Sequence, residues 1–230
     1  MKGTYVLGID QGTTGTRAMI FNHQGEPIGW AYKKHKQFYP KPGWVEHDPQ
    51  EIWKNTLAVT KEAIEKAKIG YNQICSIGIT NQRETVVVWD KETGEPLYNA
   101  IVWQCRRTAD YCAKLKEEGF EDLFRQKSGL VLDPYFSGSK IAWLLNNVPK
   151  IKDAAEKNQL LVGTIDSWLI WKLTGNHVTD YSNASRTLLM NIHEGKWDSE
   201  LLEVFKIPED ILPEIRDSSD KETYGTTHKG

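Results

Sequence analysis

The residues best suited to chemistry follow the first apolar run of the sequence. Residues 5–9 are mostly apolar, and after Asp10 a loop rich in glycine and threonine, residues 11–16, leads into a second apolar run. This pattern predicts a strand, a tight loop and a returning strand. Hydroxyls and backbone N–H groups in such a loop suit a phosphate, with Thr13 and Thr14 as donors and Arg17 as the counter-charge.

Asp10 stands at the end of the predicted first strand, beside this loop. A bare phosphate would repel its carboxylate, but a divalent cation held between them through water would attract both groups. On spacing alone, an ordinary hairpin turn with an exposed Asp10 stays equally open, because short glycine and threonine turns are common.

A second set of polar and aromatic residues follows later strands. Residues 81–84 come after an apolar run rich in β-branched residues, and Trp103 ends another run. Arg83 and Glu84 together supply donors and acceptors, as vicinal hydroxyls require, and Trp103 and Tyr135 could flank the carbon face of a small polyol. The alternatives are a solvated Arg83–Glu84 pair and ordinary core packing of the two aromatic residues.

The elements that would position these residues alternate between strands and helices. Residues 27–33 complete an antiparallel meander, and a helix begins with Asp48 as cap, Pro49 in the first turn and Glu51 completing a capping box. It runs to about residue 68 and stops at Gly70. Its apolar face is formed by Ile52, Trp53, Thr56, Leu57, Val59, Ala63, Ile64 and Ala67. Residues 74–80 are then predicted to form a buried, parallel strand.

Further strands are predicted at residues 85–89, 100–103 and 160–162, and helices at 108–118, 121–126, 138–146 and 166–173, the last closed by Gly175. This order predicts an α/β fold with a mixed β-sheet flanked by helices. If there is one such sheet, the polar groups that follow its strands converge on one edge.

Composition limits the class of function. The 230 residues are 39% hydrophobic and 26% charged with a net charge of −2, which is typical of a globular protein and shows no charge preference for nucleic acid or an acidic membrane. Three cysteines without metal-ligand spacing predict reduced thiols and a cytoplasmic location. The sequence has no P-loop, dinucleotide fingerprint, zinc spacing or GxSxG motif.

Several segments together resemble one family. Residues 8–17, Gly-Ile-Asp-Gln-Gly-Thr-Thr-Gly-Thr-Arg, resemble the first phosphate loop of the FGGY carbohydrate kinases, within the actin/hexokinase/Hsp70 superfamily, and residues 135–147 resemble that family's first signature. Residues 81–85, 103–107 and 133–137 are similar to the members that phosphorylate glycerol. Where many members have two serines, this loop reads Gly15-Thr16, which keeps backbone and hydroxyl donors. The resemblance implies an actin-like ATPase, or ribonuclease H-like, fold.

The resemblance also implies roles. ATP and Mg²⁺ would be the cofactors, with Asp10 at the metal and Thr13, Thr14 and Arg17 at the nucleotide phosphates. Glycerol would be held by Arg83, Glu84, Trp103 and Tyr135. Residues 1–230 would form the family's N-terminal, glycerol-binding domain.

The general base and the C-terminal nucleotide domain are expected beyond residue 230, so we expect these residues alone to be inactive. The full-length form is expected to be a homo-oligomer. Two alternatives stay open: another FGGY sugar kinase, acting on xylulose or gluconate, or a non-catalytic nucleotide-binding module like actin or Hsp70.

Overall fold

A computed structural model describes residues 4–227, which divide into two compact units. Unit 1 comprises the residues up to Gln37 together with His47–Gln82, and unit 2 comprises Phe38–Glu46 and the residues from Arg83 onward. The mixed α/β class is confirmed, but the expectation of one sheet is wrong, because the strands form separate sheets in the two units. Glu84, at φ 64°, takes a left-handed conformation where the chain leaves unit 1.

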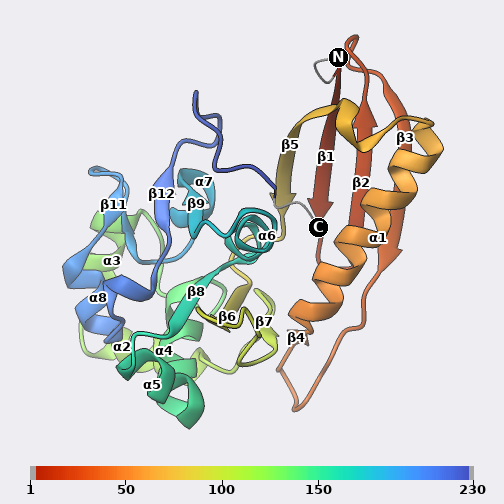
Figure 1. The fold of residues 1–230 in the computed structure, drawn as a ribbon. Coiled ribbons are helices and arrows are strands. Elements are labelled where there is room, and N and C mark those ends of the chain that lie inside the picture. The colour runs from red at the N-terminus through yellow and green to blue at the C-terminus, as the bar shows by residue number, and fades with distance from the viewer. Residues whose placement is uncertain (1–3, 228–230) are drawn as a thin grey trace. The chain divides into compact units, whose positions relative to one another are not determined.

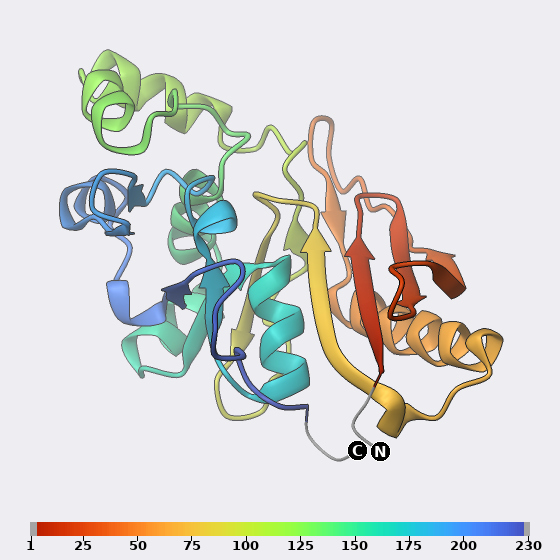
Figure 2. The same ribbon diagram turned by 90° about the horizontal axis from the view of Figure 1, so that it is seen from above.

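Unit 1 is a four-stranded sheet with one long helix on one face. Its strands are β1 (Tyr5–Gln11), β2 (Gly15–Phe21), β3 (Pro27–Lys34) and β5 (Ile74–Asn81), in the order β3-β2-β1-β5. The first three form the predicted antiparallel meander, and β5 runs parallel to β1 (Figure 2). Helix α1 (Pro49–Ala67) lies along the sheet and contacts β1, β2 and β3 (Figure 1).

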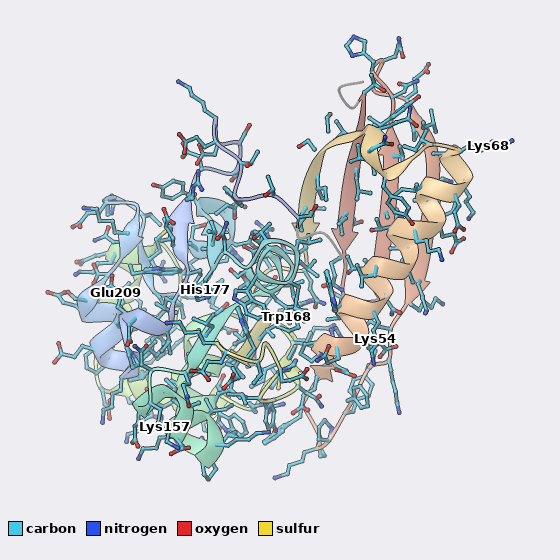
Figure 3. The ribbon with its side chains drawn as sticks, in the orientation of Figure 1. Lys54, Lys68, Lys157, Trp168, His177 and Glu209 are labelled. Carbon is cyan, nitrogen blue, oxygen red and sulfur yellow. The ribbon has the colours of Figure 1, made fainter. Side chains whose placement is uncertain are left out.

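Helix α1 begins at the predicted residue, but without the predicted capping box, since Glu51 accepts from the Lys36 N–H at 3.2 Å instead. Its end also differs from the prediction. Asp48 caps it by accepting a hydrogen bond from the Gln50 N–H at 2.8 Å, and Pro49 occupies the first turn. The helix ends because Lys68, not Gly70, adopts the left-handed conformation, and Figure 3 shows Lys68 at that end. Leu57 was expected on the apolar face but is 48% exposed, since five residues of helix rotate it about 140° from Ile52.

Strand β5 is parallel, as predicted, but not buried. Its Ile74, Ile77 and Ile79 are half-buried, and the residues between them are mostly exposed. The strand lies at the edge of the sheet, and α1 packs over the other three strands. The run of β-branched residues therefore predicted the strand correctly, but the prediction that this strand is buried is wrong.

Unit 2 is built around the strands β6 (Val86–Asp90), β7 (Ala100–Ile101) and β8 (Leu160–Thr164). Together with the short β4 (Glu46–His47) they form a four-stranded sheet, in the order β4-β7-β6-β8. Its longer helices are α2 (Ala109–Glu117), α3 (Glu121–Ser128), α4 (Ser137–Asn147), α5 (Pro149–Glu156) and α6 (Ile165–Thr174). The predicted helices are confirmed to within about two residues, and α6 ends at Gly175 as expected.

The remaining elements of unit 2 were not predicted, α5 among them. They include short strands and helices after α6: β9 (Val178–Asp180), α7 (Tyr181–Ala184), β10 (Met190–Asn191), β11 (Lys196–Trp197), α8 (Ser199–Phe205) and β12 (Glu214–Arg216). In the interior, the centroid of the Trp89 ring lies 5.3 Å from those of Trp168 and His177. Burial lowers the pKa of His177 to about 4.

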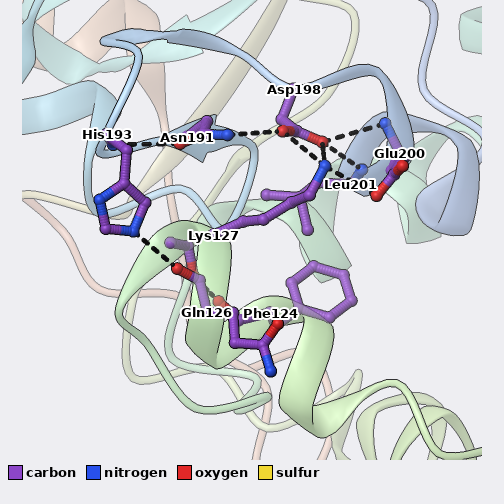
Figure 4. Close-up of polar contacts among 9 residues, drawn as sticks. Phe124, Gln126, Lys127, Asn191, His193, Asp198, Glu200 and Leu201 are labelled. Atoms are coloured by element: carbon purple, nitrogen blue, oxygen red, sulfur yellow. Dashed lines mark hydrogen bonds and ion pairs between the residues drawn. The ribbon is translucent and has the colours of Figure 1, made fainter.

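An ion-pair network joins α3 to the start of α8 (Figure 4). Asp198 caps α8 by accepting from the backbone N–H groups of Glu200 and Leu201, and Lys127 Nζ lies 3.0 Å from both of its carboxylate oxygens. Burial raises the pKa of Asp198, but the hydrogen bonds from Lys127 and Asn191 outweigh it and hold that pKa below its usual value. One carboxylate therefore stabilises two helices.

Two further observations concern the chain as a whole. Within residues 4–227, no helix is long and apolar enough to cross a membrane. Cys75, Cys105 and Cys112 are all free thiols, the first exposed and the other two buried.

Candidate active site

The loop between β1 and β2 is a tight hairpin. The Gly12 N–H donates to the Gly15 carbonyl at 2.9 Å, which leaves Thr13 and Thr14 at the tip, and the Thr14 hydroxyl lies 3.2 Å from the Tyr32 hydroxyl. A Cβ at Gly15 would lie 2.5 Å from the carbonyl oxygen of Lys33 on β3. A side chain at this position would therefore clash with β3 as it lies in this structure.

Asp10 and Arg17 are directly opposite each other in the β1–β2 register, and both are exposed. The Arg17 guanidinium lies 5.7 Å from the centroid of the Tyr32 ring. No group of three or more potential metal-ligating side chains occurs among the residues that the structure describes. An ion here would be held by the Asp10 carboxylate through water and would take its remaining ligands from water and phosphate, and Mg²⁺ commonly keeps several waters in this way.

Glu84, predicted to bind a polyol, is 3% exposed and is held from two sides. The Arg186 Nε donates to its carboxylate at 2.7 Å, and its backbone carbonyl accepts from the Ser137 hydroxyl at 3.1 Å. Arg83 is exposed, so the neighbouring residues do not share one environment. The alternative of a solvated Arg83–Glu84 pair is wrong for Glu84.

Trp103 and Tyr135 lie together in unit 2. Their ring centroids are 5.3 Å apart at 57°, and both side chains are half-buried. Tyr135 also packs against the hydrophobic core of unit 2, as the alternative interpretation expected for it. The Arg186 guanidinium lies 5.9 Å from the Tyr135 ring and 4.9 Å from the Phe136 ring. Arg186 thus links Glu84 to the aromatic pair, and sequence reasoning missed it.

A buried lysine holds the backbone at Tyr135 through hydrogen bonds. Lys140 of α4 is fully buried, and its Nζ donates to the carbonyls of Tyr135 at 2.5 Å and Phe136 at 2.8 Å. Burial lowers the pKa of Lys140 to about 7. Its signal in the sequence was a single cation directly before the apolar residues 141–145 of a predicted helix.

Comparison with known proteins identifies the family. Residues 5–229 match the model of the FGGY family of carbohydrate kinases, N-terminal domain. The chain belongs to this family. The resemblance seen in the sequence is therefore confirmed, and so is the actin-like fold that it implies.

The relatives extend well beyond this chain. The glycerol kinase of Halothermothrix orenii is 60% identical over 229 residues, 99% of this chain and 46% of that protein, and glycerol kinase 2 of Thermotoga maritima is 56% identical over 227 residues, 98% and 45% respectively. The chain thus spans about half the length of these curated relatives.

Solved structures show the same fold. Plasmodium falciparum glycerol kinase with ADP has a TM-score of 0.90 at 38% identity, covering 98% of this chain and 45% of that one. Gluconate kinase from Lactobacillus acidophilus has a TM-score of 0.83 at 27% identity, covering 92% and 42%.

Proposed function

We propose that these residues are the glycerol-holding part of an ATP-dependent glycerol kinase, which transfers the γ-phosphoryl group of ATP to glycerol and yields sn-glycerol 3-phosphate. The observation that carries the proposal is the ranking of the relatives. The glycerol kinase structure resembles this chain more closely than the gluconate kinase does, at 38% against 27% identity. Curated glycerol kinases reach 60% identity over almost the whole chain.

The polyol is held by residues of unit 2. A carboxylate has about four acceptor positions, so Glu84 can accept from glycerol hydroxyls while it keeps its bond to Arg186. The Trp103 and Tyr135 rings, 5.3 Å apart, offer an apolar wall for the carbon chain. Arg83, exposed beside Glu84, supplies the complementary N–H donors.

The nucleotide phosphates are held by unit 1. Thr13 and Thr14 present hydroxyl and backbone donors, and Arg17 supplies positive charge. Asp10 would hold Mg²⁺ through water, and the bound ion would supply charge neutralisation at the phosphate oxygens. Phosphoryl transfer depends on such positioning and electrostatic stabilisation, and we place the residue that accepts the hydroxyl proton outside residues 1–230.

Three related proposals accompany this function. Residues 1–230 act as the N-terminal, glycerol-binding domain, of which 1–3 and 228–230 lie outside the described structure, and they are expected to be inactive alone. The protein works in the cytoplasm, which its three free cysteines fit. Its full-length form is expected to be a homo-oligomer.

A substrate panel tests the proposal. The protein expressed from its own gene is assayed with ATP and Mg²⁺ against glycerol, xylulose and gluconate in an ADP-coupled assay. We expect kcat/KM for glycerol to exceed that for the other two by at least about a hundredfold, since a site built to bond particular hydroxyls rejects poorly matched ones. Equal or greater turnover of xylulose or gluconate would contradict the assignment.

A further inference from the structure

A row of amide and imidazole side chains, buried except for the half-buried Gln37, lies behind the 12–15 loop in unit 1. It runs from Gln82, which follows β5, through His47 and Gln37 to the carbonyl of Thr13. His47 is fully buried and Gln82 nearly so. These side chains come from three separate segments of the chain, yet their hydrogen bonds form one continuous series that ends at the loop.

The donor and acceptor of each bond are fixed by chemistry. A carbonyl oxygen only accepts, so Gln37 Nε2 must donate to the Thr13 carbonyl, at 2.8 Å. Gln37 Oε1 then accepts from His47 Nε2 at 2.7 Å, which leaves His47 Nδ1 to accept from Gln82 Nε2 at 3.2 Å. Gln82 Nε2 also donates to Gln11 Oε1, at 3.0 Å.

The row requires a neutral His47, and its surroundings provide one. A protonated ring would aim an Nδ1–H at the amide N–H of Gln82. Burial, reinforced by the nearby His35 ring at 4.4 Å, lowers the pKa of His47 to about 3. His35 donates in turn to the Thr13 carbonyl, at 2.9 Å, so two donors hold this one oxygen.

The orientation of the Gly12 and Thr13 carbonyls determines the direction of the N–H groups that follow them in the loop. In a planar trans peptide the C=O of one residue and the N–H of the next point in opposite directions. The Thr13 carbonyl is drawn into the buried row, and the Gly12 carbonyl accepts from Gln11 Nε2 at 2.9 Å. The N–H groups of Thr14 and Thr13 are therefore directed away from the row.

We infer that Gln37, His47 and Gln82 are positioning residues, which orient the backbone donors of the 12–15 loop toward the phosphates of a nucleotide. The inference rests on the proposed nucleotide-binding role of the loop. This function goes beyond packing. If one N–H donor of the row is replaced by an acceptor, a loop carbonyl should turn outward, and nucleotide binding should weaken while polyol binding stays the same.

Gln37→Glu and His47→Gln test the inference in the protein expressed from its own gene. The first replaces the N–H that holds Thr13 with an oxygen of the same size, and the second keeps a donor for Gln37 but leaves no acceptor at the position of His47 Nδ1, where Gln82 donates. Gln73→Glu is the matched control, because Gln73 is also half-buried in unit 1 but uses its side-chain oxygen to accept from the Gly70 N–H, which glutamate preserves.

ADP binding by calorimetry, KM for ATP and for glycerol, and the melting temperature are measured for each protein. Both test variants should weaken ADP binding and raise KM for ATP about tenfold, with KM for glycerol within about twofold of wild type and Gln73→Glu unchanged. Unchanged ADP affinity in both variants, or a parallel rise of both KM values with a lower melting temperature, would overturn the inference.

The outcomes also separate this inference from the proposed function. Loss of ADP affinity in the variants of a protein that phosphorylates no glycerol would refute only the proposed substrate. A wild-type protein that binds no ADP would refute the inference itself.

Discussion

The bond between Arg186 and Glu84 gives the most direct prediction about polyol binding. Arg186→Met removes the guanidinium and keeps most of the apolar stem. Glu84 is 3% exposed, so the change leaves a nearly buried carboxylate without its ion-pair partner at 2.7 Å. We expect the Glu84 side chain to turn and to lose its alignment toward substrate hydroxyls.

The size of the effect follows from the exposure of the pair. Removing one partner of a fully buried pair costs about 3–5 kcal/mol, but Arg186 is 31% exposed, which brings the cost to about 2 kcal/mol. Because Glu84 can turn to relieve this cost in the free variant, glycerol binding must restore the unpaired orientation, and about 2 kcal/mol then corresponds to a rise of roughly 30-fold in KM for glycerol.

Steady-state kinetics with varied glycerol at saturating ATP measure this change. Arg125→Met is the control, because Arg125 is an exposed arginine of α3 in the same unit. If Arg186→Met kept the wild-type KM and kcat for glycerol while the protein stayed folded, the claim that Arg186 holds Glu84 for the substrate would be refuted.

Three further predictions concern charge. Because His47 and His177 bind protons in the unfolded chain below about pH 6.5 but in the folded protein only near pH 3 and 4, the free energy of unfolding should fall between pH 7.5 and 5 in urea titrations; a flat profile would contradict their burial as neutral rings. The pKa of Lys140 is lowered from 10.5 to about 7, so between these pH values Lys140 binds a proton only in the unfolded chain. The free energy of unfolding should therefore rise from pH 7 to 10 relative to that of Lys140→Met, and parallel profiles for the two proteins would contradict the lowered pKa. Asp10→Asn should lower turnover on the order of 100-fold and leave calorimetric glycerol binding unchanged, whereas equal losses in both would indicate a folding defect.

Local sequence signals predicted the elements well where the cause was local. Asp48 and Pro49 marked the start of α1, and Gly175 marked the end of α6. The left-handed Lys68 carried no such signal, because its side chain does not prefer that conformation. The burial of β5 depends on its place at the edge of a sheet, which hydrophobicity does not report.

The candidate site was only partly predictable for a similar reason. Asp10, Thr13 and Thr14 are adjacent in sequence, so their common loop could be inferred. The partners that hold the site are distant: Arg186 is 102 residues from Glu84, and Gln82 is 35 residues from His47. No local pattern in a single sequence indicates which residues this far apart will be in contact.

We propose that the protein carrying these residues transfers the γ-phosphoryl group of ATP to glycerol. Phosphorus NMR of a mixture of the protein expressed from its own gene, ATP, Mg²⁺ and glycerol tests this proposal directly, since it identifies the acceptor of the phosphoryl group. We predict that the γ-phosphate signal of ATP declines as one phosphomonoester signal, that of glycerol 3-phosphate, grows. Release of inorganic phosphate alone, or an ATP signal that does not change, would contradict it.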